Sequence, residues 1–348
     1  MATLITHALL HSSITAASVP LPHLPSIDTA DITVSGLSAG GFAAVQLHIA
    51  FSATFRGAGV FAGGPFFCAG DLGVVSAETR CMRTPGLIDV DALVQITRNT
   101  AASHTVDPLV GLAPSRVYLF SGSNDTVVQP GVVRKLEAYY GTFVNGVGAV
   151  KAEYSVPAEH AMVTSDYGNE CSYKGEPYIN NCGFDAVGAM FQHMGLLNGT
   201  VRTPRRHGNA AGNVSLLQFP QAPFLPPLYT LESASMASSG LLYVPDACAA
   251  TLEATGAVSN GARCSLHVAL HGCEQTMEQI GQNFAQHAGY IKWAEVNGIV
   301  VLFPQVRSSP VNPKGCFDWW GYTGVDYASK LGAQMHAVHA MVARLAGL

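Results

Sequence analysis

A serine between two glycines links a strand-like segment to a helix-like segment near the start of the chain. Residues 31–34 have the composition of a strand, Gly36-Leu37-Ser38-Ala39-Gly40 follows, and residues 42–50 have helical composition. Glycines two positions before and after the serine let the strand and helix backbones pass closely at a tight turn. Such a turn exposes the serine oxygen, and the N–H groups at the helix start stabilise negative charge beside it. The pattern therefore predicts an α/β fold with Ser38 as a nucleophile, and the alternative is an ordinary Gly/Ser turn.

Two polar residues after later strand-like segments complete a candidate triad. A segment at 116–120 precedes Asp125 in a polar turn, and a segment at 153–156 precedes His160. The carboxyl ends of parallel strands meet at one edge of a sheet, so these side chains are expected to converge on Ser38. The order Ser, Asp, His along the chain is that of α/β-hydrolases. The weaker candidates for the acid are Asn124 and Asp89, and an Asp in such a turn is also common without catalysis.

The second half of the chain carries segments that normally precede the nucleophile of an α/β-hydrolase. A strand-like segment at 265–270 leads into His271-Gly272-Cys273. In these enzymes a His-Gly loop supplies one backbone N–H of the oxyanion hole, and the residue after the serine supplies the other. We therefore predict a circularly permuted α/β-hydrolase fold, a mostly parallel sheet with helices on both faces, in which the amides of Ala39 and Cys273 form the oxyanion hole. The alternative is two separate domains, the second a decayed copy.

Other expected elements flank these segments. They are helices at 130–140, 184–197, 283–297 and about 326–346, strands at 241–244 and 299–304, and a proline-rich stretch at 198–230 that would pass for a linker.

The predicted domain organisation is an N-terminal extension, residues 1–30, and a single catalytic domain, residues 31–348. A chain of 348 residues suits one large α/β domain or two small ones. Residues 4–17 are mildly apolar and end in small residues, but no Lys or Arg precedes them, and His7 and His11 interrupt them. The extension is thus a weak signal sequence, an ordered extension or a truncation remnant.

Composition limits the class of partner. Hydrophobic residues make up 48% of the chain, charged residues only 12%, and the formal net charge is −5. A surface poor in charge suits an uncharged or apolar ester substrate, and basic residues cluster only in a short run at 202–206, so nucleic acid is not expected as a partner. No apolar run is long enough to span a bilayer. Nothing in the sequence specifies an oligomeric state.

The eight cysteines are an even set without zinc-site spacing, which favours disulfides and an oxidising compartment. We therefore predict a secreted or periplasmic protein, against the alternative of free thiols in a cytosolic enzyme. Many pairings are open to eight cysteines, and proximity alone sets the preference. The preferred pairs are Cys68 with Cys81, Cys171 with Cys182, and Cys248 with Cys264, which leaves Cys273 and Cys316. Asn198 and Asn213 head candidate glycosylation motifs.

Five segments in combination are similar to one known family. They are Ser35–Gly41, Val60–Pro65, Ser121–Thr126, His267–Cys273 and Asn312–Trp319. They resemble the secreted single-domain polyhydroxybutyrate depolymerases of fungal type, which have a circularly permuted α/β-hydrolase fold. The resemblance runs from about residue 31 to the C-terminus. It implies Ser38 as nucleophile, His160 as general base, Asp125 as its orienting partner, and oxyanion donors at the amides of Ala39 and Cys273.

The predicted activity is hydrolysis of poly(3-hydroxybutyrate)-type polyester through an acyl-enzyme, with no metal or cofactor. The resemblance implies that Trp319 lines the substrate cleft. We expect Phe66, Phe67 and Trp320 to grip an apolar chain at the cleft mouth, with core packing as the alternative for each.

Two departures from the family leave the preferred polymer open. Glu274 replaces an apolar residue beside the oxyanion cysteine, and the loop at 306–315 is shorter and lacks an aromatic residue. The alternatives are a small-ester or aromatic-ester hydrolase, such as a feruloyl or acetyl esterase or an aromatic polyesterase, and a catalytically inactive hydrolase-fold binding protein.

Overall fold

The computed structural model describes residues 19–71, 73–197, 215–249 and 263–348. Most of the candidate signal sequence and both candidate glycosylation asparagines, Asn198 and Asn213, lie outside the described residues.

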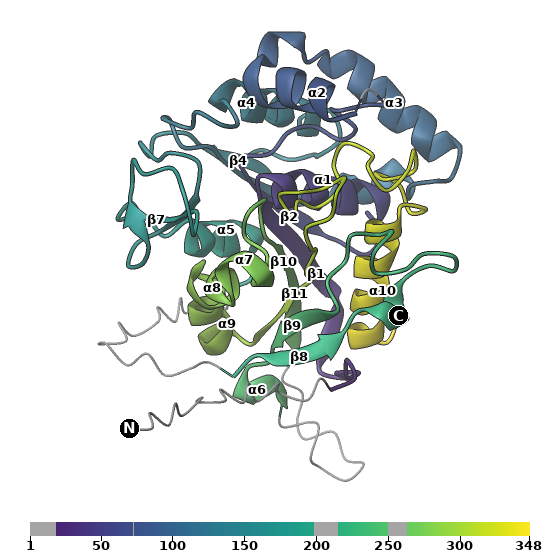
Figure 1. Cartoon of the computed structure of the whole chain (residues 1–348), viewed down its shortest axis with the longest axis vertical. Helices are drawn as coiled ribbons and strands as arrows, with labels where there is room; N and C mark the ends of the chain where they lie inside the picture. The colour runs from purple at the N-terminus through teal and green to yellow at the C-terminus, as the bar shows by residue number, and fades with distance from the viewer. Residues whose placement is uncertain (1–18, 72, 198–214, 250–262) are drawn as a thin grey trace, which may run out of the picture.

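One eight-stranded sheet takes strands from both halves of the chain (Figure 1). Its order is β4-β3-β2-β1-β10-β11-β9-β8, and β1 pairs in parallel with β2 on one side and β10 on the other. Among the described strands of this sheet, only β9 pairs antiparallel, with β11 on one side and β8 on the other. Because the halves share one sheet, they form a mostly parallel, circularly permuted α/β-hydrolase fold and not two separate sheets. The strands are β1 (Ile27–Leu37), β2 (Gly57–Phe61), β3 (Arg116–Phe120), β4 (Val150–Glu153), β8 (Leu217–Pro220), β9 (Ser239–Tyr243), β10 (Cys264–Leu270) and β11 (Ile299–Phe303).

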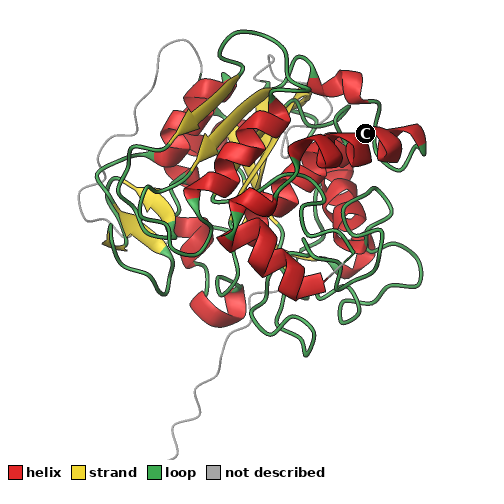
Figure 2. Ribbon diagram, turned by 90° about the horizontal axis from the view of Figure 1, so that it is seen from above, coloured by secondary structure: helices red, strands yellow, loops and turns green. Residues whose placement is uncertain are grey.

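Helices cover both faces of this sheet (Figure 2). Successive residues of β1 point to opposite faces of the sheet. The Ser35 hydroxyl lies 2.8 Å from the Tyr290 hydroxyl on one face, and Gly36 lies against the first turn of α1 on the other. Helix α10 packs on α1, where His339 stacks on Phe51, the residue after α1, with ring centroids 3.9 Å apart. Helices α1 and α10 therefore cover one face of the sheet, and α5 and α9 cover the other, where Phe191 of α5 contacts Tyr290 of α9. The helices are α1 (Ala39–Ala50), α2 (Gly73–Glu78), α3 (Val90–Ala102), α4 (Pro130–Tyr140), α5 (Ala186–Met194), α6 (Asp246–Ala249), α7 (Met277–Ile280), α8 (Asn283–His287), α9 (Tyr290–Asn297) and α10 (Ala333–Ala346).

A small three-stranded sheet lies beside the main one. It consists of β5 (Met162–Thr164), β6 (Asn169–Glu170) and β7 (Ile179–Asn181), in the order β5-β7-β6. It carries the loop from Cys171 to Cys182, whose place beside the candidate site is described below.

Strand β1 begins four residues before the predicted domain boundary. It starts at Ile27, and Leu21 and Leu24 before it are buried in the core. The Leu24 amide also donates to the Leu345 carbonyl of α10 at 2.9 Å. Apolar side chains upstream of the predicted boundary between residues 30 and 31 therefore join the core.

Other element boundaries also differ from expectation. Strand β4 ends at Glu153, where the predicted strand begins, because Ser155 turns back to donate to the Glu153 carboxylate at 2.6 Å. The predicted helix at 283–297 is broken at Gly289, which has a φ of 98°. The last helix starts at Ala333 rather than near 326, and β8 shows that the 198–230 stretch is not linker throughout.

Four disulfides join the cysteines in the three pairs favoured by proximity and in the pair that remained. They are Cys68–Cys81, Cys171–Cys182, Cys248–Cys264 and Cys273–Cys316. Such bonds persist in oxidising compartments. In the part of the chain that the structure describes, no helix is both long enough and apolar enough to span a membrane.

Candidate active site

Ser38 lies on a strained turn between β1 and α1. Its φ of 55° and ψ of −121° are unfavourable for a non-glycine residue, and its amide donates to the Phe61 carbonyl of β2 at 2.8 Å. A Cβ at Gly40 would lie 2.3 Å from the Leu270 carbonyl, so only glycine lets α1 pass so close to the end of β10. These are the features expected of a nucleophile elbow.

Asp125 and His160 form a buried pair. The Nδ1 of His160 lies 2.8 Å from the Oδ2 of Asp125, and both residues are less than a tenth exposed. The other carboxylate oxygen, Oδ1, accepts from the amides of Val127 at 2.8 Å and Val128 at 2.9 Å, which fixes the plane of the carboxylate. Because a carboxylate accepts from Nδ1–H, this tautomer leaves Nε2 of His160 as a proton acceptor.

The competing acids are occupied elsewhere. Asp89 is the N-cap of α3 and accepts from the Ala92 amide at 3.0 Å. The side chain of Asn124 is exposed and donates to the Pro157 carbonyl at 3.3 Å. Neither residue is among those that bond His160 in the described structure.

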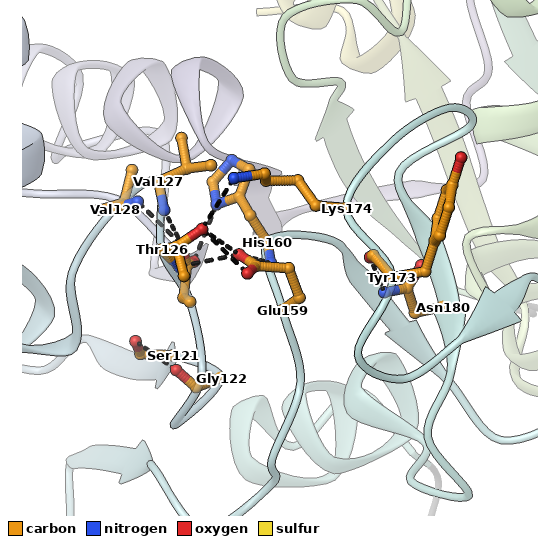
Figure 3. A network of polar contacts seen from close by, with 11 residues as sticks. Ser121, Gly122, Thr126, Val127, Val128, Glu159, His160, Tyr173, Lys174 and Asn180 are labelled. Carbon is orange, nitrogen blue, oxygen red and sulfur yellow. Dashed lines mark hydrogen bonds and ion pairs between the residues drawn. The ribbon is translucent and has the colours of Figure 1, made fainter.

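A second carboxylate, Glu159, ties the loop of the acid to the loop of the base (Figure 3). Its Oε1 accepts from the amides of Thr126 at 2.8 Å and His160 at 2.9 Å, and its Oε2 accepts from the Thr126 hydroxyl at 2.9 Å. The Nζ of Lys174 donates to that hydroxyl oxygen at 3.0 Å. Thr126 follows Asp125 in the sequence, and His160 is the base itself, so the Glu159 carboxylate holds the two loops together. Sequence reasoning missed this residue.

The His-Gly loop lies beside Ser38, as the permuted fold requires. Gly36 of β1 is in register with Leu270 of β10, so the turns that follow the two strands are neighbours. A Cβ built on Gly272 would be 3.4 Å from the Cβ of Ser38. Within the described residues the Cys273 amide donates no hydrogen bond. The Ala39 amide is at the first position of α1, where no intrahelical acceptor exists.

His271 supports this loop as a neutral side chain. Its Nδ1 lies 2.7 Å from the Gly272 carbonyl, and burial lowers the pKa of His271 to about 4. At neutral pH the ring therefore donates from Nδ1 to that carbonyl without adding charge beside Ser38.

Ser38 and His160 line one cavity of about 560 Å³. Cys273, Trp319 and Trp320 also line it, while Asp125 lies behind His160. The two tryptophans pack against each other edge to face, and Trp319 stacks on Phe42 of α1 with ring centroids 4.1 Å apart. The lining residues that lie outside the sequence motifs described above are Val74, Glu78, Met82, Arg83, Val127, Lys174 and Tyr178. They come from α2, from the helical turn at Thr79–Arg83 and from separate loops, without a common pattern in the sequence.

Phe66 and Phe67 are not among the residues that line this cavity. Phe66 is only 2% exposed, and Phe67 stacks on Tyr327 with ring centroids 5.5 Å apart. Both border a different hollow, near α3. Their expected place at the mouth of the Ser38 cleft was wrong, because core packing and the Tyr327 stack hold them elsewhere.

Asp318 organises the loop that carries the tryptophans. Its carboxylate is buried and accepts backbone N–H groups from Gly321 at 2.7 Å and Thr323 at 2.8 Å, as well as those of Trp320 and Tyr322. Burial raises the pKa of Asp318, and the hydrogen bonds oppose that rise. The carboxylate closes residues 318–323 into a compact turn.

Glu274 introduces charge at the cavity, where it is paired. The Tyr178 hydroxyl donates to its Oε2 at 2.8 Å, and the Lys314 Nζ lies 3.5 Å from its Oε1. Burial, followed by the bond to Glu274, raises the pKa of Tyr178 to about 12, so this hydroxyl remains a donor at neutral pH. Among the described residues no group of three or more His, Cys, Asp and Glu side chains is arranged to hold a metal ion.

No family model matches the chain. The poly(3-hydroxybutyrate) depolymerase of Delftia acidovorans is 46% identical over 330 residues, which cover 94% of this chain and 62% of that protein. The polyhydroxybutyrate depolymerase of Talaromyces funiculosus is 34% identical over 353 residues, covering 95% and 94% respectively. The chain therefore spans about three fifths of the first relative and nearly all of the second.

Two solved structures resemble the fold. The crystal structure of the PHB depolymerase from Penicillium funiculosum superposes with a TM-score of 0.79 at 33% identity, covering 94% of this chain and 99% of that one. The same values hold for a serine-to-alanine variant of a PHB depolymerase in complex with an R3HB trimer.

Proposed function

The chain belongs to the polyhydroxybutyrate depolymerase family, and from this premise we propose that it is a serine esterase that cleaves poly(3-hydroxybutyrate)-type polyester. The observation that carries the proposal is that Ser38, His160 and the Gly272–Cys273 turn line one cavity, with Asp125 bonded to the far side of His160. Such a set suits acyl transfer from an ester. In this proposal the two halves of the chain act as one catalytic domain that extends from β1 to α10.

The first half of the reaction forms the acyl-enzyme. Nε2 of His160 takes the proton of the Ser38 hydroxyl as its oxygen attacks the ester carbonyl carbon. The carbonyl oxygen becomes an oxyanion that accepts from the amides of Ala39 and Cys273, each donor lowering the barrier by roughly 3–4 kcal/mol. The C–O bond to the alcohol then breaks, and the imidazolium gives its proton to the departing hydroxyl end of the polymer.

The second half releases the acid. His160 takes a proton from water, the hydroxide adds to the acyl carbon, and the same two amides hold the new oxyanion. The bond to Ser38 breaks, and His160 returns the proton to the serine oxygen. Throughout, Asp125 keeps Nδ1 protonated and stabilises the positive imidazolium, because it is fixed by two backbone amides.

Substrate binding in this proposal depends on the apolar side of the cavity. Trp319 and Trp320 border it beside Met82, Val127 and other apolar groups, which suits the methyl-bearing repeat of a short-chain polyester. The disulfides further support secretion to the oxidising space outside the cytoplasm, where a polymer particle is accessible.

The test compares wild type with Ser38→Ala on poly(3-hydroxybutyrate) film and on nitrophenyl butyrate. Wild type should release soluble hydroxybutyrate oligomers, and Ser38→Ala should lose at least about 10³-fold in kcat on the soluble ester. A Ser38→Ala protein that retains wild-type turnover would refute the assignment of the nucleophile.

A second candidate function is hydrolysis of small or aromatic esters with the same machinery. It is favoured by the polar groups of Tyr178, Glu274 and Lys314 at the cavity, which can bind hydroxylated or charged substrates. An enzyme of this kind would turn over feruloyl or acetyl esters, or an aromatic polyester film, faster than it releases oligomers from poly(3-hydroxybutyrate).

A further inference from the structure

We propose that Gln275 is a positioning residue for the oxyanion hole, and that it acts by fastening the His271–Glu274 turn to the disulfide-closed loop 171–182. The proposal rests on the proposed function, because it assigns Gln275 an effect on the catalytic step attributed to Ser38 and the Cys273 amide. Gln275 is not among the residues that line the cavity, so it acts through the turn and not on the substrate.

Both ends of the Gln275 amide are engaged. Its Oε1 accepts from the Gly272 amide at 2.7 Å. Its Nε2 donates to the carbonyls of Pro177 at 2.9 Å and Tyr178 at 3.2 Å. Gln275 is 1% exposed and Gly272 is buried, so loss of the Gln275 acceptor leaves the Gly272 amide unpaired, whereas the Tyr178 carbonyl still accepts from the Met162 amide at 2.8 Å.

The bond to Gly272 determines where the Cys273 amide lies. The Cys273 N–H belongs to the same peptide group as the Gly272 carbonyl, and Nδ1 of His271 lies 2.7 Å from that carbonyl oxygen. Gln275 thus holds the N–H side of Gly272 while His271 holds its carbonyl side. With both sides fixed, the Cys273 N–H keeps one direction beside Ser38 without being used by another acceptor in the described structure.

The turn would not keep this geometry unaided. Glu274 has a φ of 61°, a region that L-residues rarely occupy and that persists only where surrounding contacts impose it. The Glu274 amide donates to the Lys314 carbonyl at 2.7 Å, and the Cys273–Cys316 disulfide links the same two segments. Gln275 adds two bonds to the backbone carbonyls of Pro177 and Tyr178, beside the bond from the Tyr178 hydroxyl to Glu274.

The loop 171–182 is also attached to the base side of the site. The Glu159 amide donates to the Cys171 carbonyl at 3.0 Å, and Lys174 of the same loop donates to Thr126 beside the acid. One short segment closed by a disulfide therefore contacts the loops of His160 and Cys273, which come from opposite halves of the permuted chain. Gln275 therefore fixes the position of the Cys273 amide, the proposed oxyanion donor, relative to His160.

The test uses Gln275→Met, which keeps the length of the side chain and removes all three hydrogen bonds. The matched control is Gln279→Met, because Gln279 also bonds locally, accepting from Thr276 to cap α7, but touches neither Gly272 nor the cavity. Two readouts are taken on folded protein: kcat and KM for nitrophenyl butyrate, and hydrogen–deuterium exchange of the peptide containing Gly272 and Cys273.

We expect Gln275→Met to lower kcat at least about tenfold with KM changed by less than about threefold, since an oxyanion donor acts mainly in the transition state. Exchange of the Gly272 amide, which loses its acceptor, should rise in Gln275→Met. Gln279→Met should change neither kcat nor that exchange, although its melting temperature falls. A kcat within about twofold of wild type in folded Gln275→Met, or unchanged exchange, would overturn the proposal. A kcat loss of equal size in both variants would also overturn it, because a general loss of stability then explains the effect.

If Gln275→Met does not fold, the same measurements are made on Gln275→Glu. It keeps an acceptor for Gly272 and loses both donors to the loop 171–182, so kcat should again fall while KM stays near wild type; an unchanged kcat overturns the fastening role. A wild-type protein that hydrolyses no ester would refute the proposed function instead, and the exchange measurement would still decide whether Gln275 holds the turn.

Discussion

Replacing Asp125 by asparagine should reduce turnover far more than it reduces stability. The Oδ1 of an asparagine can still accept from the amides of Val127 and Val128, so the turn is kept. The other terminal atom, now an NH₂ group, would face Nδ1 of His160 in place of a carboxylate oxygen 2.8 Å away. A donor at that position favours the tautomer with the proton on Nε2, which cannot accept a proton from Ser38.

The magnitude follows from the role of the carboxylate. An Asp-to-Asn change of this kind in a Ser-His-Asp triad lowers kcat by roughly 10⁴-fold in the best-studied case. At about 1.4 kcal/mol for each factor of ten, that corresponds to roughly 5.5 kcal/mol of transition-state stabilisation. The assay is steady-state hydrolysis of nitrophenyl butyrate, with circular dichroism to confirm that the variant is folded.

Asp89→Asn is the matched control, because Asp89 was the competing acid. It caps α3, and an asparagine caps a helix about as well, so both activity and stability should remain near wild type. The reasoning would be refuted by an Asp125→Asn variant that keeps more than about a tenth of wild-type kcat. It would equally be refuted by an Asp89→Asn variant with the larger loss.

Three further predictions concern the groups that hold the site in place. Burial lowers the pKa of His48 and His267 to about 3 each, below the ordinary value of 6.5, so their contribution to stability is full above pH 6.5 and is lost as pH falls towards 3. At about pH 5 each of the two histidines should lower the free energy of unfolding by on the order of 2 kcal/mol relative to pH 7. A melting temperature that stays constant between pH 7 and 5 would contradict this. Replacing Cys273 and Cys316 together by serine opens a link across 43 positions, worth about 4 kcal/mol in the chain-entropy model, and should lower both melting temperature and kcat; an unchanged kcat would show that the disulfide does not hold the oxyanion turn. Trp319→Ala removes a cavity wall, so KM for soluble 3-hydroxybutyrate oligomers should rise about tenfold or more, and an unchanged KM would exclude this tryptophan from substrate binding.

The sequence was most informative where the physical constraint is local. The spacing of Gly36, Ser38 and Gly40 encodes the close passage of strand and helix, and the strained turn is found there. The position of the His-Gly loop after a buried strand predicted the parallel neighbour of β1, because hydrolase topology leaves few places for such a strand. Three of the four disulfides join cysteines that are neighbours along the chain, which is why proximity favoured them, and the fourth joins the two cysteines that remained.

Where a residue's role depends on distant backbone groups, the sequence carried no signal. Glu159 is important because of the amides of Thr126 and His160, and Gln275 because of carbonyls in another loop. The positions of Phe66 and Phe67 were mispredicted because tertiary packing, including the Tyr327 stack, determines which way these rings face. Composition alone could not distinguish an aromatic residue in the cavity from one packed beside it.

The most direct test of the account is a crystal structure of the protein after reaction with a phosphonate ester, whose phosphoryl oxygen mimics the oxyanion. The account predicts phosphorus bonded to Oγ of Ser38, its oxygen within about 3 Å of the amides of Ala39 and Cys273, and Nε2 of His160 beside the serine oxygen. An adduct on another residue, or a phosphoryl oxygen directed away from the Cys273 amide, would contradict the claim that the two ends of the chain build one oxyanion hole.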